Sequence, residues 1–372
     1  MTTPIKFSVE PLNNGAKLGV ITLSSPKTLN ALSLEMIDPM TAQLQSWAAD
    51  PEIIVILLQG EGQKAFCAGG DIVQLYQSMC DNPTGPNAYA EAFFSREYQL
   101  DYLLHTYTKP IICWGDGIVM GGGLGLLSGC SHRVVTENTR MAMPEITIGL
   151  FPDVGGTWFL NRMPGNSGLF LGLTGASINA SDAIFTGLAD YFLASSSKES
   201  LRPTLQSIPW TTDAQSNRQI LTQALTKLSD AETKEWPPAQ VEPHMAIIND
   251  LVKPDNLSST VQAITSFSTE DKWLNRGIAS LQHGCPVTAH LVYAQLHRGC
   301  GMALNDVFRM ELSMAMNCCT RGDFQEGVRA LLIDKDQQPA WRFQKIEQVP
   351  EDWIESHFDY KWPGDQHPLS DI

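Results

Sequence analysis

Short β-rich runs alternate with helical stretches from residue 1 to about residue 193, and this alternation constrains the fold more than any other feature. The β-rich runs are Ile5 to Val9, Leu18 to Leu23, Ile53 to Leu58, Pro110 to Trp114 and Arg133 to Thr136. Helical character lies between them, for example from Asn87 to Tyr107. Strands separated by helices are typical of α/β proteins. The sequence therefore predicts an α/β fold for this part of the chain.

The rest of the chain is predicted to be mostly helical. Helical periodicity covers Gln215 to Leu228, Val287 to Arg298 and Ala303 to Met316. The polar segment 194–200 has no periodicity and is the best candidate for a boundary. We therefore predict two regions, 1–195 with the functional site and 196–372 with helices. A chain of 372 residues is long enough to bury a large core.

The acidic composition excludes two classes of partner. Lys and Arg number 25 and Asp and Glu 40, which gives a net charge of −15. Nonspecific binding to nucleic acid or to an anionic membrane needs a basic surface. We therefore expect no nucleic-acid partner and no membrane partner. A polyanionic ligand would need its own local set of lysines.

The cysteines and the N-terminal residues bear on the cellular compartment. The eight cysteines form no C-x-x-C pair, and several lie within apolar runs, as buried free thiols do. The first residues show neither a signal-peptide pattern nor an Arg-rich amphipathic pattern, and no apolar run reaches roughly 18 residues. We predict a soluble cytoplasmic protein, although a processed organellar enzyme would have the same features.

Glycine-rich loops and two carboxylates are the candidate chemical groups. The loop Cys67-Ala68-Gly69-Gly70-Asp71 follows a β-rich run, and a triple glycine spans residues 121–123. Glu145 and Asp153 lie eight residues apart, the second in a turn rich in Pro and Gly. Exposed backbone N–H groups can stabilise a carbonyl oxygen, and carboxyls can transfer protons. Taken alone, the glycines could equally serve tight turns, Glu145 could be a solvated loop residue, and Asp153 could stabilise a turn.

Further motifs are spread over almost the whole chain. They are Pro26-Lys27 with Leu29 to Leu32, Phe94 to Tyr98, Met120 to Gly123, Met143 to Glu145, Gly149 to Gly156 and Phe324 to Ala330. With the glycine loops they resemble the crotonase (enoyl-CoA hydratase/isomerase) superfamily, and within it a branch that hydrolyses 3-hydroxyisobutyryl-CoA in valine degradation. The likeness is thinnest between about Ser195 and Val287. The resemblance implies a spiral of ββα units followed by a helical C-terminal region.

The resemblance also assigns roles to residues of the site. It implies that Gly70 and Gly122 donate the N–H groups of an oxyanion hole and that Glu145 is the general base or the nucleophile. It places Asp153 beside Glu145, in contact with the substrate, where two close carboxyls shift each other's pKa and one is protonated near neutrality. Glu97 would accept a hydrogen bond from the acyl hydroxyl, although an exposed helix Glu beside Arg96 is an alternative.

One departure from the wider superfamily bears on the reaction. Hydratases carry a second catalytic Glu shortly after the triple glycine, where this chain has Leu124-Gly125-Leu126, and they tend to have Gly where Asp153 stands. Gly125 cannot move a proton. The sequence therefore favours hydrolysis of an acyl-CoA thioester. The alternatives are a hydratase or isomerase of the same fold and an acyl-CoA-binding protein without activity.

Coenzyme A would enter as part of the substrate, and the resemblance implies no other cofactor. It maps contacts to the coenzyme A moiety onto Lys27, Leu29, Lys64 and Lys335, while Val73 replaces a lysine found in some relatives. These lysines would provide the local basic set that the acidic total requires. No metal site is expected, because His283, His290 and His297 lack H-E-x-x-H or cysteine partners. A homo-oligomer is compatible with the sequence.

Overall fold

The computed structural model describes residues 3–362, 364 and 366–372. Its chain forms two compact units, each assembled from three segments. The first unit holds Met1–Gly70, Leu100–Met141 and Ile178–Ala239, and the second holds Asp71–Gln99, Ala142–Ser177 and Gln240–Ile372. The units therefore differ from the predicted regions 1–195 and 196–372.

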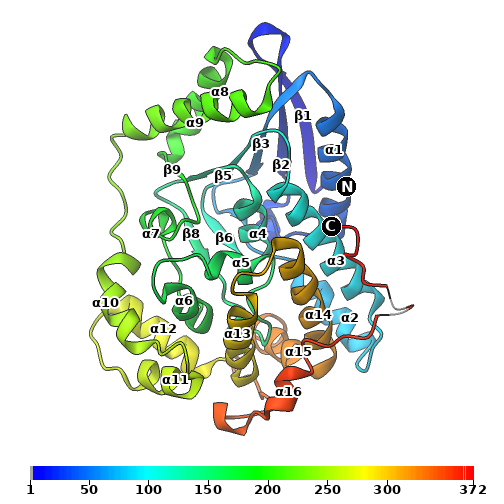
Figure 1. The fold of residues 1–372 in the computed structure, drawn as a ribbon, viewed down its shortest axis with the longest axis vertical. Coiled ribbons are helices and arrows are strands. Elements are labelled where there is room, and N and C mark those ends of the chain that lie inside the picture. The colour runs from blue at the N-terminus through cyan, green and yellow to red at the C-terminus, as the bar shows by residue number, and fades with distance from the viewer. Residues whose placement is uncertain (1–2, 363, 365) are drawn as a thin grey trace. The chain divides into compact units, whose positions relative to one another are not determined.

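A six-stranded sheet organises the first unit (Figure 1). Its strands, in spatial order, are β1 (Ile5–Pro11), β2 (Lys17–Leu23), β3 (Ile53–Gly60), β5 (Ile111–Gly115), β7 (His132–Val135) and β9 (Tyr191–Phe192). The β1–β2 pair is antiparallel, and the pairs from β2 to β9 are parallel. Parallel strands need crossover connections, which explains why helical segments separate the apolar runs in the sequence. The strands predicted from these runs are confirmed.

Helices of the first unit bury the apolar side chains of this sheet. They are α1 (Leu34–Ala49), the second part of α3 (Ala88–His105), α4 (Gly122–Gly129), α7 (Ala180–Phe185), α8 (Lys198–Ser207) and α9 (Ala214–Asp230). Leu201 on α8 and Leu221 on α9 join one buried cluster with Leu57 on β3. Both helices can be followed in Figure 1. Because their apolar faces complete the core of the sheet, the first unit continues past residue 195.

A smaller sheet, also in the first unit, carries the glycine loops. It consists of β4 (Ala65–Cys67), β6 (Ile118–Met120) and β8 (Arg140–Ala142), in that order, and β8 ends at the start of the second unit. β4 and β6 are parallel, so the loops that follow them leave the sheet at the same edge.

The second unit is built from helices and turns. They are α2 (Ile72–Asp81), the first part of α3, η3 (Glu145–Thr147), α5 (Gly156–Leu160), α6 (Ser167–Thr174), α10 (Val241–Leu251), α11 (Leu257–Ser266), α12 (Lys272–His283), α13 (Pro286–Gly299), α14 (Leu304–Arg321), α15 (Asp323–Val328), the π-helix η5 (Arg329–Ile333), η6 (Ile346–Gln348) and α16 (Glu351–Glu355). The helices predicted from periodicity correspond to α3, α9, α13 and α14, and are confirmed. In the described part of the chain, none of the helices has the length and apolarity needed to span a membrane.

Candidate active site

The two predicted glycine loops contact each other in the first unit. A Cβ atom added to Gly123 would lie 2.2 Å from the carbonyl oxygen of Cys67, so only glycine fits there. Gly69 has φ +113°, and a Cβ on it would lie 3.5 Å from the carbonyl oxygen of Met120. Close packing therefore requires glycine at Gly123, whereas the positive φ favours glycine at Gly69. This packing holds the loop that carries Gly70 against the loop after β6.

Gly122 begins helix α4, and its N–H is among the donors that helix geometry leaves without an intrahelical acceptor. The preceding Gly121 has φ 46° and ψ −124°, a backbone conformation that side chains exclude. The whole of α4 is buried. Gly70 pairs with Leu32 through an isolated parallel bridge. The predicted donors, Gly70 on the loop after β4 and Gly122 at the start of α4, thus lie at one edge of the small sheet.

Three of the residues predicted to contact coenzyme A lie beside the first glycine loop, with Lys27 in the 3₁₀ helix η2 (Pro26–Thr28). Lys27 and Lys64 are exposed, and Leu29 adopts a left-handed conformation with φ 55°. The carbonyl of Leu29 accepts a hydrogen bond from the N–H of Ala68 at 3.1 Å. The loops of Lys27 and Lys64 are joined by Asn30, which is fully buried. Its amide Nδ2 donates to the carbonyls of Glu61 and Ala65, both at 3.0 Å.

Glu145 is a buried carboxyl in the second unit. It is the first residue of the 3₁₀ turn η3 and directly follows Pro144. Its Oε2 atom has no hydrogen-bond partner among the described residues. Burial and then the charge of Asp153 raise the pKa of Glu145 well above its usual range. The alternative of a solvated loop residue is wrong, because the side chain is removed from water.

Asp153 is also buried, and the hydroxyl of Tyr98 donates to its Oδ2 at 2.7 Å. Burial raises the pKa of Asp153 to about 6, while the hydrogen bond from Tyr98 lowers it. Asp153 is therefore mainly ionised at neutral pH. Its negative charge is close enough to Glu145 to raise the pKa of that residue, as expected for a pair of carboxyls.

Glu97 on α3 completes a set of buried carboxyls in the second unit. Its Oε1 atom has no hydrogen-bond partner among the residues that the structure describes. Burial and the charge of Asp153 raise the pKa of Glu97 well above its usual range. The alternative of an exposed helix residue is wrong, since only 2% of Glu97 is exposed. Two predicted carboxyls, Glu97 and Glu145, thus each keep an unpaired buried oxygen.

The turn that carries Asp153 is anchored by residues that the sequence did not identify. Glu311 on α14 accepts hydrogen bonds from the backbone N–H of Gly155 at 2.8 Å and of Thr157 at 2.9 Å. The amide of Gln295 on α13 donates to the carbonyl of Pro152 at 2.8 Å. Tyr98 lies next to Glu97 in the motif Phe94 to Tyr98, and this position was the only sequence feature that could have indicated its role. Glu311 lies in none of the motifs that resemble the family.

Gly149 and Gly327, which belong to two further motifs, allow close packing of the backbone. A Cβ on Gly149 would lie 2.4 Å from the carbonyl oxygen of Asp323, and a Cβ on Gly327 would lie 2.4 Å from the carbonyl of Ile148. Gly149 also has φ +72°. The backbones of α15 and of the segment between Glu145 and Asp153 therefore approach so closely that side chains are excluded at these two positions. The backbone of the motif at residues 324–330 therefore packs against the segment that connects Glu145 and Asp153.

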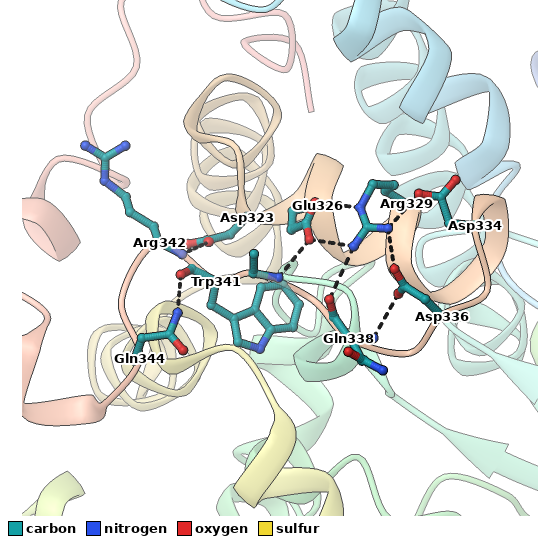
Figure 2. A network of polar contacts seen from close by, with 10 residues as sticks. Asp323, Glu326, Arg329, Asp334, Asp336, Gln338, Trp341, Arg342 and Gln344 are labelled. Carbon is teal, nitrogen blue, oxygen red and sulfur yellow. Dashed lines mark hydrogen bonds and ion pairs between the residues drawn. The ribbon is translucent and has the colours of Figure 1, made fainter.

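Lys335, also predicted to contact coenzyme A, lies on an exposed loop of the second unit and has φ 58°. Figure 2 shows Arg329 at the centre of the contacts that shape this loop. Its guanidinium pairs with Glu326, with Asp334 at 2.6 Å and with Asp336 at 2.7 Å. Glu326 also accepts from the N–H of Ala340 at 2.7 Å. Arg329 thus contacts residues before and after Lys335 and stabilises the loop that carries this lysine.

The three histidines considered as metal ligands each contact a backbone carbonyl. His283 ends α12, whereas His290 and His297 lie on α13, so the three do not share a helix. A ring nitrogen of each contacts a backbone carbonyl, at 2.8, 3.0 and 3.0 Å respectively. Within residues 3–362, 364 and 366–372, no group of three or more His, Cys, Asp or Glu side chains is arranged to hold a metal ion.

Comparison with known proteins identifies related chains. A family model described as enoyl-CoA hydratase/isomerase matches residues 18–358. The mitochondrial 3-hydroxyisobutyryl-CoA hydrolase of Xenopus tropicalis is 38% identical over 344 residues, which covers 91% of this chain and 86% of the relative. The protein of the same name from Gallus gallus is 36% identical over 340 residues, with the same coverage of both chains.

Solved structures share the fold. The structure of an enoyl-CoA hydratase from Rhodobacter sphaeroides 2.4.1 has a TM-score of 0.81 at 30% identity and covers 95% of this chain and 96% of its own. That of a carnitinyl-CoA dehydratase from Mycobacterium thermoresistibile has a TM-score of 0.83 at 29% identity, with coverages of 96% and 97%. The predicted fold class is confirmed. The names of these relatives cover more than one reaction, so the residues of the site must distinguish between them.

Proposed function

The chain belongs to the enoyl-CoA hydratase/isomerase family, and we propose that it is a thioester hydrolase acting on 3-hydroxyisobutyryl-CoA. The observation that carries the reaction type is Gly125, which lies buried within α4. Hydratases of the family have a catalytic Glu shortly after the triple glycine, and Gly125 cannot replace it. The buried pair of Glu145 and Asp153 instead supplies the carboxyls that hydrolysis needs. Identity of 36–38% to curated hydrolases supports the same reaction.

In the proposed reaction, Glu145 acts as a general base on water. Water adds to the thioester carbonyl while the Glu145 carboxylate takes its proton, and the carbonyl oxygen becomes negative. The N–H groups of Gly70 and Gly122 donate to this oxygen, and each such donor contributes about 2.7–4 kcal/mol. The C–S bond then breaks, coenzyme A leaves as a thiolate, and Glu145 releases its proton to the thiolate or to solvent.

A covalent route uses the same groups. Glu145 would attack the carbonyl itself, release coenzyme A and form a mixed anhydride, which water then opens to regenerate the carboxylate. The unpaired Oε2 of Glu145 suits either route. Neither route requires a strong acid, because a thiol with a pKa of about 8.5 leaves readily as its thiolate.

Asp153 and Glu97 have supporting roles in this proposal. With a pKa of about 6, Asp153 is mainly ionised at neutral pH, and its charge makes Glu145 a stronger base. Glu97 holds the hydroxyl of the acyl group through its unpaired Oε1. A 3-hydroxyacyl group can satisfy such a buried oxygen, whereas an acyl group without the hydroxyl leaves it unpaired.

The coenzyme A moiety is proposed to bind through Lys27, Leu29, Lys64 and Lys335. The exposed ammonium groups of the lysines can neutralise phosphates without desolvation of a buried charge. Leu29, whose backbone has a left-handed conformation, lies two positions after Lys27 and is proposed to contact the ligand as well. No metal or further cofactor takes part in this proposal. The cytoplasmic location, the absence of nucleic-acid partners and homo-oligomer formation stay predictions.

Free-thiol release from a panel of acyl-CoA substrates tests this function. The expected result is turnover of short 3-hydroxyacyl-CoA, fastest with 3-hydroxyisobutyryl-CoA and at least about 10-fold slower without the hydroxyl. The chain has eight free cysteines, of which Cys80 and Cys300 are exposed, so a blank with protein alone must be subtracted. Absence of thiol release from every acyl-CoA would favour a binding protein without activity.

A further inference from the structure

The turn from Pro152 to Thr157 is strained and is held by side chains from three helices. Val154 has φ 52° and Gly155 has φ 85°, so two consecutive residues occupy the left-handed region. A β-branched residue rarely adopts this conformation unless its surroundings enforce it. The enforcing contacts come from α3, α13 and α14, all within the second unit.

Glu311 fixes the backbone of this turn. Its carboxyl is fully buried, and each oxygen accepts one backbone N–H, from Gly155 and from Thr157. The side chains around it on α14, Phe308, Leu312 and Met314, are buried and apolar. A carboxyl at such a position is costly to bury, and the only hydrogen bonds described for it go to this turn. Burial accordingly raises the pKa of Glu311 to about 8.

Tyr98 fixes the side chain of Asp153. Its ring is fully buried and packs against Phe94 and Phe308, with centroids 5.9 and 5.8 Å away. The ring therefore has little freedom to turn, and its hydroxyl is aimed at Asp153 Oδ2 at 2.7 Å. A Cβ on Gly155 would touch Phe308 at 3.4 Å, so the same aromatic side chain also contacts the turn.

We propose that Tyr98 and Glu311 are positioning residues that together orient Asp153 for the hydrolysis proposed above. Glu311 sets the path of the backbone after Asp153, and Tyr98 sets the direction of its carboxylate. Neither residue contacts the reacting atoms in the proposed reaction. The inference rests on the proposed function, because it needs Asp153 to contribute to turnover.

The electrostatic setting of Asp153 makes the role of Tyr98 measurable. The titratable groups that face Asp153 are Glu97 and Tyr98 from α3, Glu145 from η3, and Glu311 and Cys319 from α14. The described groups that face it include no cation, so the Tyr98 hydroxyl is its main side-chain stabiliser. Loss of this donor should raise the pKa of Asp153, so that a larger fraction of this carboxyl is protonated near neutral pH.

The test compares Tyr98→Phe and Glu311→Gln with matched controls. Phenylalanine keeps the ring and removes the donor, and glutamine keeps the shape but can accept only one of the two N–H groups. We expect each variant to lower kcat about 10-fold with less than about 3-fold change in KM, since small displacements of catalytic groups reduce turnover. For Tyr98→Phe the loss of kcat should be larger near pH 6 than near pH 8, where Asp153 is ionised again.

The controls make the same chemical changes far from the turn in sequence. Tyr107→Phe removes a buried hydroxyl that donates to the carbonyl of Leu44 at 2.6 Å, and Asp182→Asn alters a buried carboxyl that caps α7. Both should lower the melting temperature and leave kcat and its pH dependence unchanged. If Tyr98→Phe and Glu311→Gln behave like these controls, the inference is overturned. If Glu311→Gln does not fold, the pH dependence of kcat for Tyr98→Phe alone tests the positioning role.

Asp153→Asn separates failure of this inference from failure of the proposed function. Impaired turnover by Asp153→Asn with normal turnover by Tyr98→Phe would overturn only the positioning role. Normal turnover by Asp153→Asn would instead remove Asp153 from the proposed reaction and the inference with it. Reduced turnover of all three variants, with the pH dependence described for Tyr98→Phe, is the expected result.

Discussion

Burial gives Glu145 a higher proton affinity than an exposed carboxyl has. The raised pKa and the unpaired Oε2 are the properties expected of a general base. We therefore predict that Glu145→Gln lowers kcat by roughly 100-fold or more, because proton transfer contributes at least that much. Binding of substrate, measured by calorimetry with the inactive variant, should persist. Near-normal thiol release would assign the base to another carboxyl.

The pH dependence of turnover follows from the raised pKa of Glu145. Glu145 must be ionised to act, and its raised pKa means that kcat/KM increases as the pH rises from acidic values. Asp153→Asn removes a negative charge that helps to raise this pKa, so the acid limb of the profile should move to lower pH. Profiles recorded for both proteins provide the test. An acid limb that stays in place or moves to higher pH would contradict the coupling of the two carboxyls.

The sequence motifs pointed to the three carboxyls that the structure buries, but not to Tyr98 and Glu311, which contact the turn of Asp153. Glu145, Asp153 and Glu97 were found because their motifs resemble those of a known family. Tyr98 lies 55 positions from Asp153, and Glu311 lies 154 and 156 positions from the two N–H groups it accepts. No local pattern encodes such distant pairs. Glu311 also interrupts an apolar helix face, where sequence alone cannot show what a carboxyl binds.

Among the elements, the loop after η5 depends on a single arginine. Arg329 pairs with Glu326, Asp334 and Asp336 (Figure 2). Lys335, between the two aspartates, adopts a left-handed conformation. Arg329→Ala would leave three carboxylates together and release the loop. We predict a rise in KM for acyl-CoA of about 10-fold with kcat changed less than about 3-fold, because Lys335 loses its orientation.

A matched substitution controls for loss of a surface ion pair. Arg202→Ala on α8 removes the pair of Arg202 with Glu10, whose atoms are 2.8 Å apart, but frees no loop. Steady-state kinetics should show an unchanged KM, since exposed ion pairs contribute little on their own. Equal KM values for Arg329→Ala and the native protein would show that the loop around Lys335 does not take part in binding.

Periodicity predicted the strands and long helices well, because alternation and amphipathic spacing are local properties of the chain. It did not predict which elements pack together. Leu201 and Leu221 indicated that α8 and α9 each have an apolar face, but not that these faces cover the large sheet. The compact units therefore interleave along the chain, whereas the sequence suggested one boundary.

For the whole molecule, the proposed hydrolysis requires no metal ion. The carbonyl is polarised by backbone N–H groups, and the base is a carboxylate. Dialysis against a chelator should therefore leave the rate of thiol release unchanged. A loss of activity that added zinc or magnesium restores would require a different means of polarising the carbonyl.

We propose that this member of the family hydrolyses a thioester and does not hydrate a double bond. One protein preparation can be given crotonyl-CoA, with the enone absorbance followed, and 3-hydroxyisobutyryl-CoA, with thiol release followed. Because Gly125 provides no second carboxylate, we predict little loss of enone absorbance together with rapid thiol release. Rapid hydration of crotonyl-CoA without thiol release from the hydroxyacyl substrate would contradict the proposed thioester hydrolysis.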